Sequence, residues 1–426
     1  MSLKNLVLST VAASMLATSA FGAAGPVTLE QDSTGDYLVF PSYFALSASQ
    51  WKTNLKVVNT NTTHAVVAKV VIREAATSKE NLDFLIYLTP GDVWEGEIHN
   101  DGIVKISSTD DSVFKGDTPV SATNKMDQIL FDNGPKGNTY GYVEVYGVAQ
   151  IAATDVVSSW VVATPLSKTK LYNKYNSLVG ATTNGDWIPV DNDSIYGQQV
   201  IYSDGIGGEK SMAMMATAFG GFVGGVNRNT IKATTTTLAN SISLPNLPTT
   251  VLNQTEEILA KDNVFVTYYN SDAANTVLQL LSPMKKYHFD DLGRNGLVAT
   301  NNPYYIYRSA SDTTPAAYAD NTKAYEYTVT ARDQEEHSVK KDNDFSGGLV
   351  QHSYCYEELC YIKAGTDTSG FEMGYLDYGF LPPVAGAGEP VIPTVITGVK
   401  VNSAAITNII YPAYRDRSAT TNLAHH

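Results

Sequence analysis

The side chains best suited to metal binding stand in two short acidic loops. Asp191 and Asp193 belong to the sequence DNDS, and Asp342 and Asp344 belong to KDNDFSGG. Carboxylate and backbone oxygens in such loops are the ligands that Ca²⁺ prefers. Neither loop has the spaced ligands and the closing Glu of an EF-hand, so a solvated turn is the competing interpretation. The four aspartates are therefore candidate calcium ligands, and the sequence indicates no other cofactor.

The cysteine pair is the second chemical feature. The chain has two cysteines, Cys355 and Cys360, in the stretch YCYEELC. Such a near pair is typical of a small-loop disulfide in an exported protein. His352 and His337 lie upstream and leave a zinc site as an alternative, although only fragments of the usual ligand spacing are present. A thioredoxin-like redox pair needs two intervening residues, and here there are four.

Motifs for catalysis are missing from the sequence. No G-x-S-x-G or H-E-x-x-H occurs, which argues against the serine hydrolases and zinc peptidases that carry them. The stretch GIGGEKS at 205–211 has Glu209 where a phosphate-binding loop requires Gly before Lys. Asp92, Glu95 and Glu97 are close together, but alternation places the two glutamates on the wet face of a strand. The sequence therefore predicts that the protein is not an enzyme.

Composition and the N-terminus indicate an exported protein. Lys4 is followed by an apolar run, and Ala20-Phe21-Gly22 fits signal cleavage after Gly22, so residues 1–22 are a predicted signal peptide. No later segment is apolar enough to span a membrane as a helix. The chain contains 26 Tyr and only 17% charged residues, which is typical of a β-rich extracellular protein. Its net charge of −14 argues against nucleic acid as a partner.

Apolar alternation predicts most of the strands. In NLDFLIYLTPGDVWEGEI, residues 81–98, the two strands flank a type II turn with Pro90 and Gly91 at its centre. One strand face carries Leu82, Phe84, Ile86 and Leu88, and Trp94 in the next strand is expected to be a core or edge aromatic. The strand 65–74 is predicted to have one buried face and one half-wet face containing Lys69 and Arg73. The stretch 37–46 is predicted to be an edge strand because Pro41 lacks an N–H group.

Strand runs separated by short turns predict a mainly β fold. We expect an immunoglobulin-like β-sandwich in the N-terminal part and a second β-rich region with one or two short helices. The candidate helices are 210–219 and 253–261, and a β-hairpin with a five-residue loop is expected around 271–275. The predicted parts are a signal peptide (1–22), a β-sandwich domain (36–165), a Thr/Asn/Gly-rich insertion or connecting region (166–262) and a second β-rich domain (263–415).

Three segments carry a resemblance to a known group. YLVFPSYFALS, LKVVNTNTTHAVVAKVVIREAATSKENLDFLIYLTPGDVW and VFVTYYNSDAANTVLQLLSPMKKYH are similar to segments of exported, surface-associated β-rich proteins of Gram-negative bacteria. The resemblance covers about a third of the chain. The last of the three segments, VFVTYYNSDAANTVLQLLSPMKKYH, departs from the pattern of the group. The resemblance implies export and a β-rich fold, and it brings no catalytic residues.

Several functions fit these observations. We expect a structural or interaction protein of the cell surface, extracellular space or periplasm, which assembles with itself into a surface layer or filament or binds other surface components. An extracellular glycan- or ligand-binding module is the main alternative, because Tyr and Trp with Asp and Asn suit sugar faces and hydroxyl groups. An enzyme with an unfamiliar site and an outer-membrane barrel are the remaining hypotheses.

Overall fold

The computed structural model describes the chain from residue 26 to residue 416 with gaps. The described residues are 26–46, 51–76, 78, 80–132, 137–152, 165–191, 193–203, 210–222, 249–271, 274–284, 325–333, 338–341, 353–355, 359–363, 373–380, 388–401, 404–411 and 415–416. Within them the protein is mainly β, with two helices, and every strand pairing is antiparallel. The expectation of a β-rich fold with one or two helices is therefore confirmed.

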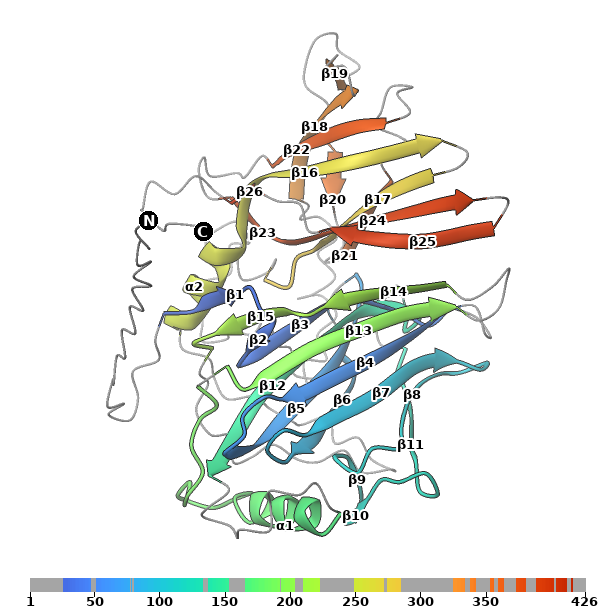
Figure 1. Cartoon of the computed structure of the whole chain (residues 1–426). Coiled ribbons are helices and arrows are strands. Elements are labelled where there is room, and N and C mark those ends of the chain that lie inside the picture. The colour runs from blue at the N-terminus through green and yellow to red at the C-terminus, as the bar shows by residue number, and fades with distance from the viewer. Residues whose placement is uncertain are drawn as a thin grey trace, which may run out of the picture.

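Two sheets form the lower block of the molecule (Figure 1). Sheet 1 has the order β1-β15-β3-β12-β5-β6. Its strands are β1 (Thr28–Glu30), β15 (Thr217–Gly220), β3 (Tyr37–Phe44), β12 (Tyr140–Ala152), β5 (His64–Glu74) and β6 (Glu80–Leu88). Sheet 2 has the order β11-β8-β7-β4-β13-β14, and β2 also pairs with β13. Its strands are β11 (Met126–Ile129), β8 (Val104–Ser108), β7 (Val93–Asn100), β4 (Lys52–Asn59), β13 (Ile195–Ser203), β14 (Lys210–Met215) and β2 (Thr34–Gly35).

One apolar core joins sheets 1 and 2. The predicted face of β6, Leu82 through Leu88, lies in it together with Trp94 and Ile98 of β7. The predicted face of β5 (Val66, Ala68, Val70 and Ile72) belongs to the same core. Period-two alternation thus predicted which side chains of these strands face this core.

Sheet 3 forms the upper block and has eleven strands (Figure 1). Its main order is β19-β18-β22-β16-β17-β24-β25. These strands are β19 (Ser338–Lys341), β18 (Tyr325–Asp333), β22 (Met373–Phe380), β16 (Ala260–Ser271), β17 (Ala274–Leu281), β24 (Ile392–Val401) and β25 (Ala404–Tyr411). Four short strands pair at the sides of this order: β20 (Ser353–Cys355), β21 (Leu359–Lys363), β23 (Glu389–Pro390) and β26 (Arg415–Asp416).

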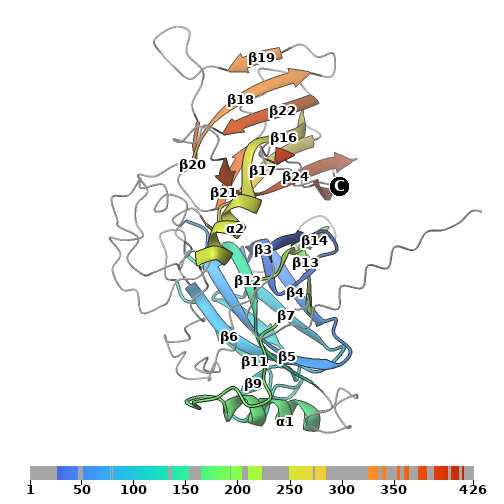
Figure 2. The ribbon, with the colours of Figure 1, turned by 90° about the vertical axis from the view of Figure 1, so that its left-hand side faces the viewer.

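One helix lies at the base of the lower block, and the other lies between the two blocks (Figure 1). Helix α1 (Pro165–Asn176) is at the base of the lower block, near the small pair β9 (Phe114–Lys115) and β10 (Thr118–Pro119). Helix α2 (Thr249–Leu259) lies where the lower and upper blocks meet, as Figures 1 and 2 both show. Its position confirms the helix predicted at 253–261 over most of that range.

The two blocks are joined by a second buried core and by hydrogen bonds. Leu281, Leu359 and Ile392 of sheet 3 share this core with Val71 and Tyr142 of sheet 1. The N–H of Leu359 donates to the carbonyl of Ala75 at 2.8 Å, and the amide Nε2 of Gln279 donates to the carbonyl of Pro41 at 2.8 Å. We call this contact region the block junction.

Pro41 does not mark an edge strand, and this prediction was wrong. Strand β3 is internal in sheet 1, between β15 and β12. Its pairing with β12 is irregular at this point, because the register jumps between Gly141–Tyr43 and Val143–Phe40. A β-bulge leaves residues without a ladder bond, so a proline is tolerated in an internal strand there.

The second face of β5 is also drier than predicted. Lys69 and Arg73 are fully buried. Lys69 pairs with Asp83 of the neighbouring β6 at 2.7 Å, and Arg73 pairs with Glu144 of β12. Two further apolar clusters cover this side of sheet 1, so the charges are buried as pairs and not exposed.

The segment 210–219 is not the helix that its Met and Ala content suggested. It forms β14 and the start of β15. Met212 and Met214 are buried, and Ser211, Ala213 and Met215 between them are exposed, which is a period of two. Pairing with β13 overrides helix propensity here.

Strand pairing changes the expectations for the β16–β17 hairpin and for the region 166–262. The hairpin of β16 and β17 closes with Ser271 opposite Ala274, so its connection is shorter than the five residues predicted. The region 166–262 supplies α1, β13, β14, β15 and α2, and its strands pair with β4 and β3 of the N-terminal part. The predicted domain boundaries themselves stay predictions.

Candidate functional site

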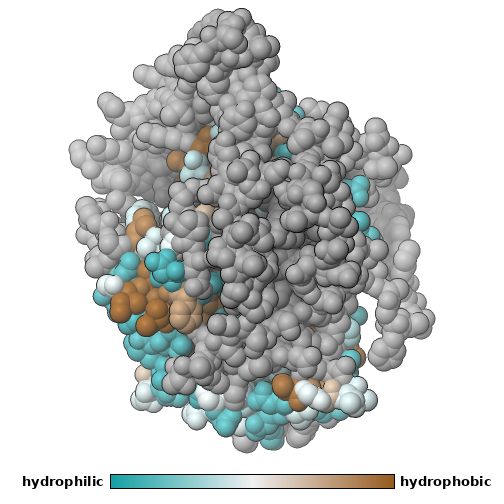
Figure 3. All heavy atoms as spheres, turned by 180° about the vertical axis from the view of Figure 1, so that it is seen from behind, coloured by the Kyte–Doolittle hydropathy of each residue, from teal (hydrophilic) through white to brown (hydrophobic). Residues whose placement is uncertain are grey.

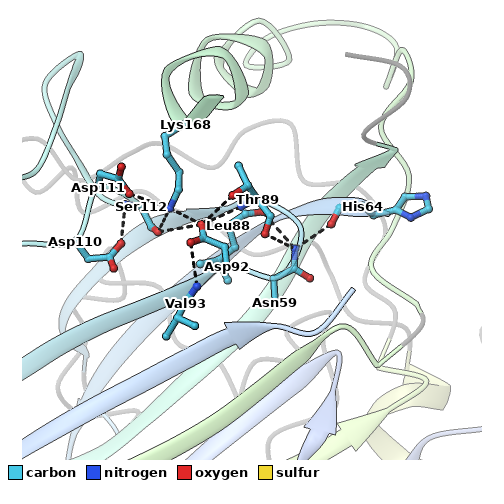
Figure 4. Close-up of polar contacts among 10 residues, drawn as sticks. All are labelled: Asn59, His64, Leu88, Thr89, Asp92, Val93, Asp110, Asp111, Ser112 and Lys168. Carbon is cyan, nitrogen blue, oxygen red and sulfur yellow. Dashed lines mark hydrogen bonds and ion pairs between the residues drawn. The ribbon is translucent and has the colours of Figure 1, made fainter. Parts of the chain in front are cut away.

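The turn between β6 and β7 adopts the geometry that the sequence predicts. Gly91 has a φ of +72°, and the N–H of Asp92 donates to the carbonyl of Thr89 at 3.1 Å. The Asp92 carboxylate accepts from the N–H of Thr89 at 3.0 Å and from the N–H of Val93 at 3.0 Å. Asn59 supports the turn, since its Nδ2 donates to the carbonyls of Thr89 at 3.0 Å and His64 at 2.9 Å (Figure 4).

A buried lysine reaches this turn from helix α1. Lys168 Nζ forms ion pairs with Asp92 and, at 3.1 Å, with Asp111 Oδ1, and it donates to Ser112 Oγ. Ser112 Oγ also lies 3.4 Å from Asp92 Oδ2. Figure 4 shows the lysine pointing from the helix onto these residues. We call Asp92, Asp111, Ser112 and Lys168 the turn cluster.

The turn cluster contains a Ser and a Lys in contact, which is a known arrangement for nucleophilic catalysis. Two features argue against that use. Ser112 and Lys168 are both fully buried, so a substrate has no access to the hydroxyl. Lys168 Nζ also forms ion pairs with two carboxylates, Asp92 and Asp111, so it is not directed at Ser112 alone. The contacts of Lys168 fit a structural role, in which they hold helix α1 against the turn between β6 and β7.

A second buried ion pair lies within sheet 1. Arg73 pairs with Glu144, donates from Nη1 to the Ser78 carbonyl at 3.1 Å, and is fully buried. Tyr37 OH donates to Glu144 Oε1 at 2.8 Å. Burial raises the pKa of Glu144, and the neighbouring guanidinium opposes that rise. The pair satisfies its own hydrogen-bonding groups and has no path to a ligand, so it is a structural element of the core.

The predicted calcium ligands Asp191 and Asp193 belong to a larger acidic group. The charges of both contribute to the raised pKa of Asp36, and the charges of Glu30 and Asp32 act on Asp193. We call these five residues the acidic cluster. Asp36 Oδ1 accepts from the N–H of Asp193 at 3.0 Å, and Asp191 Oδ1 accepts from Gln150 Nε2 at 3.0 Å. Burial first, and then Asp193, raise the pKa of Asp36 to about 8.

The acidic cluster is not arranged as a ready metal site. Across the described ranges, no group of three or more His, Cys, Asp or Glu side chains is placed to hold a metal ion. Asp342 and Asp344, the other calcium candidates, lie outside the described residues. Calcium binding therefore stays a prediction at both loops.

A cleft of about 510 Å³ opens between the two blocks. Its walls come from β1 and the turn after it, from β14 and β15, from the end of α2, and from the start of β24. The lining residues are Leu29, Glu30, Gln31, Ser33, Pro41, Ala213, Met214, Met215, Ala216, Thr217, Leu259, Lys261, Val391, Ile392, Pro393 and Thr394. This volume is within the range of about 300–1,000 Å³ that is usual for ligand pockets.

The cysteine pair is described only in part. Cys360 is buried on β21, opposite Leu280 of β17, and Cys355 stands on β20, opposite Tyr325 of β18. The side chain of Cys355 lies outside the described residues, as do His337, His352 and most of the Gly-rich stretch 205–211. The predicted disulfide and the alternative zinc site both stay predictions.

Sequence reasoning missed Lys168, Glu30 and Asp36 as members of polar clusters. Lys168 is 76 residues from Asp92, and Asp36 is 157 residues from Asp193, so only the folded arrangement brings them together. Pro165, suited to the first position of a helix, is the one local signal for the helix that carries Lys168.

No family description, no curated protein and no solved structure matches this chain. In the part of the chain that is described, no helix has the length and apolar character needed to cross a membrane.

Proposed function

We propose that this chain is an exported structural or interaction protein of the cell surface that associates with further copies of itself. The signal-like N-terminus and the resemblance of its sequence segments support export. The antiparallel sheets and the buried ion pairs support a structural role, because Lys168 with Asp92 and Arg73 with Glu144 connect different elements and are buried.

The observation that carries the proposal is an apolar patch at the edge of sheet 2. Among the described strands, β11 lies at the edge of sheet 2 and pairs only with β8. Ile103, Ile129 and Phe131 are 51%, 48% and 44% exposed. The ladder places Ile129 opposite Lys105, and Leu130 N–H donates to the Val104 carbonyl, so Ile129 and Phe131 stand at or just after the end of β11 and Ile103 stands directly before the start of β8. We call these three residues the edge patch.

Exposed apolar groups at a strand edge favour association with another chain. Figure 3 shows that apolar side chains also gather into a patch with a hydrophilic border on the rear face of the molecule. Lys105 borders the edge patch and pairs with Asp101 at 3.5 Å and with Asp127 at 3.6 Å. A second copy that binds there would contact an apolar patch with a charged border, which is the usual composition of a protein interface.

Light scattering coupled to size exclusion tests the proposal on residues 23–426, with and without millimolar calcium. We expect assemblies larger than the monomer, and we expect Ile129→Lys to dissociate them because a charge replaces an exposed apolar group. Val179→Lys is the matched control, since Val179 is 44% exposed in the turn after α1 and does not belong to the edge patch. A monomer under both calcium conditions contradicts self-association.

The finer fold assignment is part of the same proposal. We propose that sheets 1 and 2 form a β-sandwich of the immunoglobulin-like class. The shared core of the two sheets supports the sandwich arrangement.

Extracellular ligand binding is a second candidate function, and the cleft between the blocks favours it. Glu30, Gln31, Ser33 and Thr394 place polar groups among apolar walls, a composition that suits small-molecule recognition. A panel of glycans tested by thermal shift checks this function. A ligand that binds the cleft of the folded protein raises the melting temperature, and the increase grows with the logarithm of the ligand concentration above Kd.

A further inference from the structure

One buried ion pair joins two neighbouring strands of sheet 1. Lys69 of β5 stands opposite Leu85 of β6, and Asp83 of β6 stands opposite Val71 of β5, so the lysine and the aspartate are diagonal neighbours on one face of the sheet. Lys69 Nζ lies 2.7 Å from Asp83 Oδ2, and the two side chains are 0% and 4% exposed. Val71 and Leu85 belong to the two apolar clusters that cover this face, so the pair lies in a dry environment.

A third ionisable side chain contacts this pair. Glu80, at the start of β6, stands opposite Arg73 on the same face, and its Oε2 atom is buried. Burial first, and then the charge of Asp83, raise the pKa of Glu80 to about 8. A hydrogen bond to Asp83 adds to the rise, and the charges of Lys69 and Arg73 oppose it. Glu80 therefore holds a proton at neutral pH, beside the carboxyl group of Asp83.

An amine, a carboxyl group and a neighbouring acid are the groups that amide formation requires. An amine is a nucleophile only when it is uncharged, and a dry environment favours the uncharged forms of an ion pair. Transfer of one proton from Lys69 Nζ to Asp83 gives an amine in contact with a carboxylic acid. The carbon to be attacked, Asp83 Cγ, is bonded directly to the oxygen that Nζ contacts. Well-oriented groups within one molecule react with effective molarities of about 10⁵–10⁸ M.

We propose that Lys69 and Asp83 condense into an intramolecular amide bond, with Glu80 as the general acid and base. The lone pair of Nζ attacks Cγ of Asp83, the Nζ–Cγ bond forms, and the bond from Cγ to the hydroxyl oxygen breaks. Glu80 gives its proton to the leaving hydroxyl, which departs as water, and it takes one proton from the attacking nitrogen. The step exchanges protons and releases water, and it needs neither an oxidant nor a reductant.

The other buried ion pairs described above lack this combination of groups. Arg73 pairs with Glu144, but a guanidinium stays protonated in proteins and is not a nucleophile. Lys168 is shared between Asp92 and Asp111, and the Asp92 carboxylate accepts hydrogen bonds from two backbone N–H groups. The amide is therefore placed between β5 and β6.

The position of the bond suits a structural protein. Strand β6 is the last strand of sheet 1 in the described pairing order, and its only described strand partner is β5. A covalent bond to β5 prevents this strand from separating from the sheet. The inference does not depend on self-association or on a ligand in the cleft, since it concerns three side chains within one molecule.

Intact mass spectrometry of residues 23–426, denatured and reduced, tests the proposal. We expect most of the protein to be lighter than its sequence by the mass of one water molecule. Glu80→Gln should have the full mass of its own sequence, because the proton transfer is lost. Glu95→Gln is the matched control and should keep the loss, since Glu95 pairs with Lys56 at 2.6 Å on the exposed surface. A parent protein with the full mass of its sequence overturns the proposal, and a loss that persists in Glu80→Gln overturns the role of Glu80.

Digestion with trypsin locates the bond. An amide at Lys69 blocks cleavage there, so we expect residues 57–73 joined to residues 80–105 in one branched peptide. Lys69→Arg keeps a cation beside Asp83 but supplies no amine, so it should release residues 80–105 as an unbranched peptide and retain the circular dichroism of a folded β protein. A loss of water that maps to another place, such as Lys168 and Asp92, contradicts the proposal.

Discussion

At the scale of single residues, Asp36 is the group whose protonation depends most clearly on the fold. The carboxyl is 1% exposed, and burial together with Asp193 raises its pKa from an ordinary value of 3.8 to about 8. Between these two values the folded protein holds a proton that the unfolded chain releases. The free energy of unfolding therefore falls as pH rises from about 4 to about 8.

The variant Asp36→Asn keeps an acceptor for the N–H of Asp193 and removes the ionisable group. We expect it to raise the free energy of unfolding at pH 8 by about 1–3 kcal/mol and to change it little at pH 4. Denaturant unfolding at both pH values measures this difference. Asp132→Asn, at an exposed position, is the control and should shift neither value. An equal effect of Asp36→Asn at both pH values would show that the pKa of Asp36 is not raised in the folded protein.

Lys168 gives a second prediction at this scale. Lys168→Ala leaves Asp92 and Asp111 without their buried cation, so we expect a loss of about 3–5 kcal/mol in the free energy of unfolding. Lys174 lies on the same helix and pairs with the exposed Asp186 at 2.8 Å. Lys174→Ala should therefore cost less than about 1 kcal/mol. Chemical denaturation compares the two variants, and similar losses would show that the turn cluster does not hold α1.

At the scale of elements, the cysteine pair would connect two strands that pair at different places in sheet 3. Strand β20 pairs with β18, and β21 pairs with β17. A Cys355–Cys360 disulfide closes a small loop, for which chain entropy predicts a stabilisation of about 2 kcal/mol. Peptide mapping of the unreduced protein should find the bond, and replacing both cysteines by serine should lower stability by that amount. Alkylation of both thiols without a reductant would disprove it.

The strands also show which parts of the fold could be predicted from the sequence. Alternation predicted which faces of β5, β6 and β7 pack into the core between sheets 1 and 2, because successive side chains of a strand point to opposite faces. It did not predict that the second face of β5 is buried as well. Alternation also did not predict the structure of segments whose conformation depends on the strand they pair with. The bulge beside Pro41 and the strand formed by 210–215 depend on their partners β12 and β13. The acidic cluster and the cleft depend on pairings between residues far apart in sequence, which local patterns do not contain.

At the scale of the whole molecule, the block junction should make the two blocks unfold together. Leu359 is fully buried there, and its N–H donates to the Ala75 carbonyl of the lower block. Apolar burial of this kind couples the stability of the sheets that share it. Sheet 3 contributes β17, β21 and β24 to the block junction, and β17 pairs with both of the others. We therefore expect a substitution at Leu359 of β21 to weaken the packing of all three strands against the lower block.

Leu359→Ala should cost about 2–5 kcal/mol and separate the unfolding of the blocks into two transitions. Leu376→Ala is the matched control, because Leu376 is equally buried in sheet 3 but belongs to the core away from the junction. Calorimetry of the two variants and the parent protein measures the number of transitions. We expect one transition for the parent, two for Leu359→Ala, and a single lowered transition for Leu376→Ala. If both variants behave alike, the junction does not couple the blocks, and each sheet system is stabilised by its own core.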